Sequence, residues 1–174
     1  MEEKLLIKRA KNGDKEALLS LVMIQKSDYY KLAYVYMKNE HDSLDAIQDM
    51  IVILYENIHK LKKNDAFYSW SKTILVNSCK SILKKNKRVI SIEDIKEEGV
   101  YEVYENPENK IILEKYLSKL NPIHEEIIRL RYFVDLDYET IGNILKIPLG
   151  TVKSRISIGM KILKESMEGD DMNE

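Results

Sequence analysis

The side chains best suited to binding DNA lie close together near the C-terminus. Two hydroxyls and two cations occupy one short segment, as Thr151, Lys153, Ser154 and Arg155. Hydroxyl, ammonium and guanidinium groups donate hydrogen bonds to phosphate oxygens and to base edges. They can act together only if a helix presents them on an accessible surface, so the elements around this segment decide its chemistry.

The surrounding sequence has the pattern of a helix-turn-helix. Asp137 is a good N-cap for a short helix with apolar Ile141, Ile144 and Leu145. The run from Lys146 to Pro148 ends that helix, because proline lacks an N–H and disfavours helix in the residue before it. A second helix is predicted from Leu149, with an apolar stripe of Val152, Ile156, Met160 and Leu163. The four polar residues stand elsewhere on its first turns, where a recognition helix reaches DNA.

Charge along the chain is segregated. Net charge is −1 over 174 residues, but residues 79–90 and 146–164 carry several cations and no acid. Between them, residues 93–108 carry seven acids against Lys96. Phosphate binding needs local positive surface rather than a basic average. Two basic segments around an acidic one therefore indicate two nucleic-acid surfaces joined by a spacer.

Composition and single residues exclude several other classes of function. Hydrophobic residues make up 44% of the chain and Gly and Pro are scarce, which favours packed helices. We expect a cytoplasmic protein, since no run of 18 apolar residues, no signal peptide at Met1–Lys4 and no partner for Cys79 occurs. The histidines (His41, His59 and His124) have no Cys or carboxylate at metal-ligand spacing, and no Gly-rich phosphate loop occurs. No metal, cofactor or catalytic centre is predicted, and Cys79 is expected to be a core thiol.

The N-terminal half is predicted to be a helical bundle, residues 1–89. Asp14 is expected to cap the second helix, Ser27 or Asp28 the third and Asp42 the fourth. The fourth helix has a seam with heptad spacing, formed by Leu44, Ile47, Ile51, Leu54, Ile58 and Leu61. Met50 and Ile53 are expected at the bundle centre, and Val52 is expected to be exposed to a partner. Residues 60–65 are a polar loop, and a fifth helix, 67–83, buries Trp70 and ends in a basic cluster.

The predicted fold is all-α, with two helical domains joined by a flexible acidic linker. The linker is residues 90–105. Asn106-Pro107 and Asn121-Pro122 each place an N-cap Asn before a proline at the first helical position. With the helix-turn-helix they complete a four-helix C-terminal domain, 106–168, followed by a tail, 169–174.

These features together resemble bacterial sigma factors of the extracytoplasmic-function (ECF) type, over roughly residues 3–165. Leu120–Phe133, Leu136–Gly142 and Gly150–Arg155 resemble the domain that reads the −35 promoter element. Asp45–Asp49 falls where the family docks on the polymerase clamp, and Phe67–Asn77 resembles its −10 segment. The resemblance implies a promoter-specificity subunit rather than an enzyme, with core RNA polymerase, promoter DNA and an anti-sigma factor as partners and no membrane insertion of its own.

The resemblance also implies roles for individual residues. By this resemblance, the residues that contact the −35 element are Thr151, Lys153, Ser154 and Arg155. The loop from Leu61 to Ala66 would capture a flipped promoter base, and −10 contacts fall to Lys62, Lys63, Asn64, Asn77, Lys80, Lys84, Lys85 and Arg88. Polymerase docking falls to Asp45, Gln48, Asp49 and Val52.

Three departures from the family pattern stand out. Leu44 stands where the family usually has an acid, and Ser81 stands where it usually has an Asp. After Arg155 the family often continues with further Arg, whereas this chain has Ile158-Gly159-Met160 there. Two alternatives stay open at this point: a helix-turn-helix regulator that binds DNA without polymerase, and a helical protein-interaction module. The first is less favoured, because residues 1–89 show no βα pattern and no phosphate or metal site typical of a ligand or receiver domain.

Overall fold

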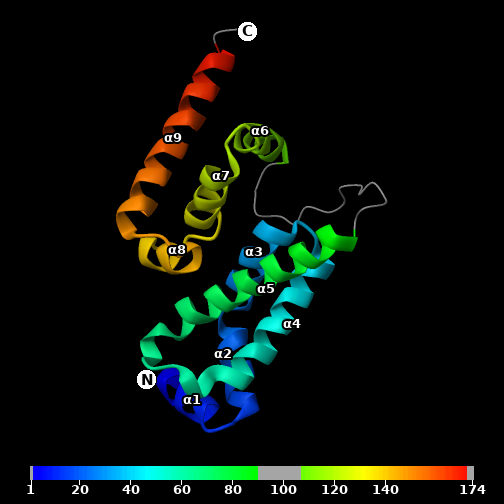
Figure 1. Cartoon of the computed structure of the whole chain (residues 1–174), viewed down its shortest axis with the longest axis vertical. Helices are drawn as coiled ribbons and strands as arrows, with labels where there is room; N and C mark the ends of the chain where they lie inside the picture. Colours follow the sequence, from blue (N-terminus) through cyan, green and yellow to red (C-terminus); the bar gives the residue numbers. More distant parts are fainter. Residues whose placement is uncertain (1, 90–106, 172–174) are drawn as a thin grey trace. The chain divides into compact units, whose positions relative to one another are not determined.

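The computed structural model describes residues 2–89 and 107–171, and the predicted linker, 90–105, lies outside them (Figure 1). All regular structure in the described residues is helical, which confirms the all-α prediction. The chain divides into two compact units, Met1–Val100 and Tyr101–Glu174. None of the described helices combines the length and the apolar character that a membrane span requires.

The N-terminal unit is a bundle in which α3, α4 and α5 pack on one another while α1 and α2 form an adjoining pair (Figure 1). Two short 3-10 turns, Ile58–Lys60 and Asn64–Ala66, connect α4 to α5. The helices are α1 Glu2–Lys11, α2 Lys15–Ile24, α3 Lys26–Met37, α4 Glu40–Asn57 and α5 Phe67–Val89. Helix α5 thus extends beyond its predicted end at Leu83, and the basic segment that follows Leu83 is part of the helix.

Two of the three predicted caps in this unit are wrong. Asp14 does cap α2, since its Oδ1 accepts the Ala17 N–H at 3.0 Å. The α4 cap, however, is Asn39, whose Oδ1 accepts the Asp42 N–H at 2.8 Å. Asp42 instead lies in the first turn, where a carboxylate is favoured by the helix dipole. The α3 helix begins directly after Gln25, which makes no side-chain cap, so neither Ser27 nor Asp28 caps it.

The buried face of α4 differs from the predicted seam. The helix buries Ser43, Ala46, Met50 and Leu54, whereas Leu44 is 43% exposed and Ile53 is 37% exposed. Met50 lies at the bundle centre as predicted and Val52 is exposed as predicted, but Ile53 is not central. The helix ends before Ile58, but Leu54, Ile58 and Leu61 of the predicted seam are all buried. Small Ser43 and Ala46 fit the tight packing of α4 in the bundle, which an apolar pattern alone does not reveal.

A buried hydrogen bond ties α3 to α5. Tyr29 Oη and Ser71 Oγ lie 2.7 Å apart, and both residues are fully buried. Burial raises the pKa of the Tyr29 hydroxyl, because the ionised form would lose its hydration. Phe67 is also fully buried, while Trp70 is only half-buried, so Phe67 rather than Trp70 anchors the start of α5 in the core.

We expect Tyr29→Phe to lower the free energy of unfolding by about 1 kcal/mol. The substitution removes the hydroxyl that pairs with Ser71, while Ser71 keeps its bond to the Tyr68 carbonyl. Urea unfolding of the full chain measures the change. Tyr55→Phe, at a position 42% exposed, is the matched control and should change stability by less than about 0.5 kcal/mol. Equal effects of the two substitutions would contradict a stabilising role for the buried bond.

The C-terminal unit contains the predicted four helices. They are α6 Pro107–Leu117, α7 Pro122–Ile128, α8 Tyr138–Leu145 and α9 Leu149–Asp171, and a π-helical turn, Arg129–Phe133, follows α7. Asn121 caps α7 as predicted, since its Oδ1 accepts the His124 N–H at 3.0 Å. Asn106, the predicted cap of α6, lies outside the described residues. Helix α9 includes residues 169–171, which the sequence assigned to the tail.

The apolar stripe of α9 contains a glycine rather than the predicted methionine. Val152, Ile156 and Leu163 are buried, but Met160 is 42% exposed and Gly159 takes its place on the stripe. A Cβ at Gly159 would lie 3.1 Å from Ile128 Cγ1. The missing side chain therefore lets α9 approach α7 closely at this point, and only a hydrogen fits without displacing Ile128.

Candidate nucleic-acid interface

The helix-turn-helix is built as the sequence predicts. Asp137 caps α8, accepting hydrogen bonds from the Thr140 N–H and the Thr140 hydroxyl, both at 2.8 Å. Partial burial alone would raise the pKa of the Asp137 carboxyl, but these bonds outweigh it and lower the pKa. The turn then passes through Lys146 in the left-handed region, at φ 55°. A Cβ at Gly142 would lie 3.1 Å from the Ile147 carbonyl oxygen, so the turn packs closely on α8.

The four predicted −35 residues lie on the first turns of α9. Lys153 and Ser154 are exposed, and Thr151 and Arg155 are half-buried. Lys153 and Arg155 are two residues apart on a helix and so lie on opposite flanks of its outward face. The Ser154 hydroxyl donates to the Thr151 carbonyl at 3.1 Å. Ile158, in the segment that departs from the family pattern, is 49% exposed on the same helix.

A buried arginine, which sequence reasoning did not single out, holds α6 against α7. Arg129 is only 8% exposed. Its Nη1 donates to Glu114 Oε1 at 2.8 Å, and its Nε donates to Glu125 Oε1 at 2.9 Å. A second bond joins Arg129 Nη2 to the other oxygen of Glu114, making a two-pronged pair. Burial opposes the charge, but the two carboxylates overcome it and raise the pKa of Arg129. In the sequence, the i, i+4 spacing of Glu125 and Arg129 was the one feature that could have indicated this ion-pair network.

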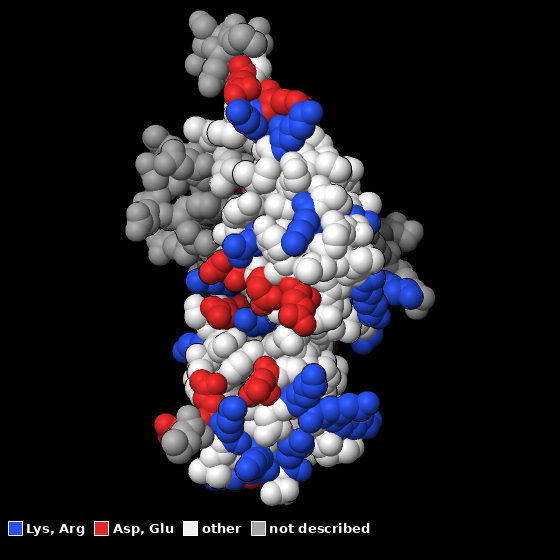
Figure 2. Space-filling model, turned by 90° about the vertical axis from the view of Figure 1, so that its left-hand side faces the viewer, with Lys and Arg blue, Asp and Glu red and all other residues white. Residues whose placement is uncertain are grey.

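The predicted −10 residues fall into two groups in the N-terminal unit. Lys62 and Lys63 are exposed on the loop between the two 3-10 turns, with Asn64 half-buried beside them. Asn77, Lys80, Lys84 and Lys85 are exposed along α5, and Lys80 Nζ lies 5.6 Å from the centre of the Tyr36 ring. Arg88 belongs to α5, but its side chain lies outside the described residues. Figure 2 shows basic side chains gathered at the end of this unit where α1 lies.

The predicted docking residues share one exposed face of α4. Asp45, Gln48, Asp49 and Val52 follow i, i+3, i+4 and i+7 spacing and all are exposed, Val52 by 56%. Leu44 and Tyr55, 43% and 42% exposed, are the large apolar residues nearest each end of the face. An accessible surface that mixes carboxylates, an amide and large apolar side chains is typical of a protein-binding face.

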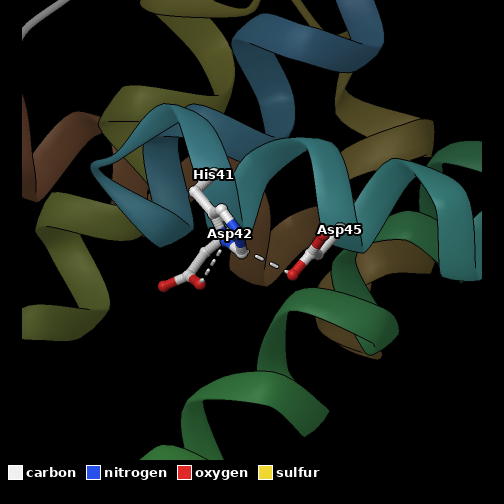
Figure 3. A group of neighbouring side chains, drawn as sticks. All are labelled: His41, Asp42 and Asp45. Atoms are coloured by element: carbon white, nitrogen blue, oxygen red, sulfur yellow. Dashed lines mark ion pairs between the residues drawn. The ribbon is translucent and has the colours of Figure 1, made fainter.

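His41 has carboxylate neighbours that the sequence analysis excluded. Its Nδ1 lies 3.4 Å from Asp45 Oδ2 and 3.7 Å from Asp42 Oδ1 (Figure 3). The i, i+4 spacing on α4 brings His41 and Asp45 to one side of the helix. The statement that no carboxylate stands at ligand spacing was therefore wrong for His41. Both His41 and Asp45 are exposed, and we assign the group only the ion pair that forms when His41 is protonated.

A helix-turn-helix that follows a second helical unit in the chain is typical of a small number of DNA-binding protein families. Family comparison agrees with both units: the Sigma-70 region 4 model matches residues 116–165 and the Sigma-70 region 2 model matches residues 21–89. The chain belongs to the sigma-70 family of RNA polymerase sigma factors and is of the ECF type. It acts in promoter-specific initiation of transcription with RNA polymerase.

Two curated relatives match along nearly their whole length. RNA polymerase sigma factor SigV of Bacillus subtilis is 28% identical over 165 residues, covering 95% of this chain and 99% of SigV. ECF RNA polymerase sigma factor SigW of Bacillus subtilis is 29% identical over 177 residues, covering 92% of this chain and 94% of SigW.

Two solved structures share the fold. CnrH, in complex with the cytosolic domain of CnrY, superposes with a TM-score of 0.70 at 18% identity, covering 98% of this chain and 99% of CnrH. The sigma factor RpoE of Bartonella quintana, in complex with the anti-sigma factor NepR, superposes with a TM-score of 0.66 at 20% identity, covering 84% of this chain and 94% of RpoE.

Proposed function

We propose that the two units divide promoter recognition between them, with region 4 reading the −35 element and region 2 reading the −10 element. The observation that carries this proposal is the exposure of polar and basic side chains at the first turns of α9, in a helix-turn-helix with intact caps. Thr151, Lys153, Ser154 and Arg155 supply the −35 contacts. Duplex DNA accepts such a helix in its major groove.

The −10 element is read by the N-terminal unit. The loop Leu61–Ala66 receives a flipped base, and its exposed Lys62 and Lys63 contact the neighbouring phosphates together with Asn64. Asn77, Lys80, Lys84 and Lys85 continue this surface along α5, since they are exposed on that helix, and Arg88 lies at its end. Cations next to an unpaired strand favour binding through the phosphates and leave base choice to the loop.

Core RNA polymerase binds the exposed face of α4 formed by Asp45, Gln48, Asp49 and Val52. The polymerase supplies catalysis and this chain supplies recognition, so the chain is not an enzyme and needs no cofactor. Its working place is the cytoplasm, where polymerase and promoter DNA are found. An anti-sigma factor is a further partner, by analogy with the RpoE complex. The proposed domain limits are 1–89, 90–105 and 106–168, with a tail at 169–174.

Capture of core polymerase by the tagged chain, followed by run-off transcription, tests the proposal as a whole. We expect capture, and transcription that depends on the added chain. A chain that binds DNA but neither captures polymerase nor supports transcription would be a regulator of the ordinary helix-turn-helix kind instead.

For the docking face, we expect Gln48→Ala with Asp49→Ala to weaken core binding by about 1 kcal/mol, roughly fivefold. Both side chains are exposed, so their truncation opens no cavity and circular dichroism should show an unchanged helical content. Fluorescence anisotropy titration with core polymerase measures the affinity. Glu16→Ala, which removes an exposed carboxylate from α2, is the charge control. Equal core affinities of the double variant and this control would rule out the assigned face.

A further inference from the structure

The first helix, α1, contacts the loop that the proposed function assigns to base reading. Lys11, in the last turn of α1, donates from Nζ to the Leu61 carbonyl oxygen at 2.8 Å. The same ammonium lies 3.5 Å from Asn64 Oδ1. Helix α1 precedes residues 21–89, over which the region 2 family model matches. The loop is therefore braced by a part of the chain outside the matched region.

The two acceptors of Lys11 lie on either side of the exposed cations of the loop. Leu61 and Asn64 bracket Lys62 and Lys63, so one ammonium holds the chain on both sides of these two lysines, which stay exposed. An ammonium has donors and no acceptor, and so it must face the oxygen of the Asn64 carboxamide. The amide nitrogen of Asn64, at the other end of that group, is then left as the donor for a base.

The backbone that carries Lys11 is itself held in place. Arg9, two residues earlier, donates from Nε to Asp14 Oδ2 at 2.8 Å, and Asp14 is the cap of α2. This pair ties the end of α1 to the start of α2. An ion pair between Lys4 of α1 and Asp65 of the loop is weaker, since the two groups are 3.3 Å apart but 69% and 80% exposed. Lys11 is half-buried, so it is the contact that water screens least.

We propose that Lys11 is a positioning residue for promoter reading: it holds the loop Leu61–Ala66 in the conformation that accepts the −10 base before DNA arrives. The proposal rests on the proposed role of this loop. A loop that is already ordered loses less conformational freedom on binding, and a charge-assisted hydrogen bond is strong enough to change its ordered population roughly tenfold. An unordered loop still contacts phosphates through Lys62 and Lys63 but does not distinguish bases. The ordered population that Lys11 maintains therefore sets the base preference, although Lys11 does not touch the base.

The test uses holoenzyme reconstituted from core polymerase and the full chain, transcribing a promoter library with randomised −35 and −10 elements. Sequencing of the transcripts gives the base preference at each position. We expect Lys11→Met to reduce the preference at one −10 position about tenfold and to leave all −35 preferences unchanged. Lys11→Arg keeps a cationic donor and should restore most of the preference. Base preference is a ratio of transcript amounts. A variant with a smaller folded fraction therefore gives less transcript in total but keeps the same base preference.

Lys8→Met is the matched control, since it removes an exposed lysine from the same turn of α1. It should lower transcription evenly if the lysine acts only as a surface charge, with every preference kept. A Lys11→Met profile identical to that of Lys8→Met would overturn the positioning role.

A loop variant separates the two proposals. Lys63→Ala with Asn64→Ala should flatten the −10 preference if the loop reads the base. If this variant keeps the wild-type preference, the role of the loop fails and the role of Lys11 fails with it. If it flattens the preference while Lys11→Met does not, only the role of Lys11 is overturned.

Discussion

Arg129→Met should lower the free energy of unfolding of the C-terminal unit by about 2–3 kcal/mol. Arg129 is buried and its guanidinium binds two carboxylates, one from α6 and one from α7. Removing one partner of a buried ion pair leaves charge that the protein no longer compensates, which costs about 3–5 kcal/mol when the remaining groups are fully buried. Here Glu114 is 41% and Glu125 is 24% exposed, so water recovers part of that cost.

Arg131→Met provides the control for Arg129. Arg131 lies two residues further on. It pairs with Asp135, which is 91% exposed, and donates to the Leu136 carbonyl oxygen at 3.1 Å, so its loss should cost about 1 kcal/mol. Thermal and urea unfolding of the full-length variants, followed by circular dichroism, give the two values. A loss for Arg129→Met no larger than that for Arg131→Met would show that the buried network does not hold α6 in place.

Arg155→Ala should weaken promoter binding by about 1–3 kcal/mol, with the loss confined to one position of the −35 element. Arg155 is half-buried on α9, and a partly buried side chain has less conformational freedom to lose on binding. A planar guanidinium can bind a base edge with two hydrogen bonds, whereas an ammonium is a point charge. Arg155→Lys should therefore restore little of the lost specificity. Binding titrations with a set of singly substituted −35 duplexes measure the effect.

Lys153→Ala is the comparison for Arg155→Ala. Lys153 is exposed on the opposite flank and is expected to contact phosphate, so its removal should weaken binding to every duplex alike. The slope of log affinity against log salt should then fall by about one. If Arg155→Ala also weakened all duplexes evenly, and Arg155→Lys restored affinity, Arg155 would be a phosphate contact and its assignment to a base would be wrong.

The sequence predicted those parts of the fold that depend on local signals. Asp14, Asn121 and Asp137 are caps because their side chains bond to backbone groups three residues away, a relation that is visible in the sequence. The exposure of the predicted docking face of α4 also follows from spacing within one helix. Local rules still failed where two caps of similar chemistry stood close together, since Asn39 and Asp42 are both good candidates for α4.

What the sequence could not predict depends on contacts between distant segments. Glu114 and Arg129 are fifteen residues apart and Lys11 and Leu61 are fifty apart, so no periodic pattern relates them. Small residues gave a second kind of failure. Ser43, Ala46 and Gly159 are buried because they let helices approach, and hydrophobic periodicity gives such residues little weight against neighbouring Leu44 or Met160.

The close packing of α9 on α7 at Gly159 and Ile128 also bears on the rotational setting of the recognition helix. Side chains of an α-helix extend to a radius of roughly 5–6 Å, so a rotation of about 20° around the axis moves their ends by about 2 Å. Hydrogen bonds tolerate only about 0.5 Å of variation in length. A methyl group added at Gly159 would require the Ile128 side chain to shift by a few tenths of an ångström. If α9 turned instead, we expect Lys153 and Arg155 to face different atoms of the DNA. We therefore expect a residue on the side of α9 away from its proposed DNA-binding surface to influence which bases that helix reads.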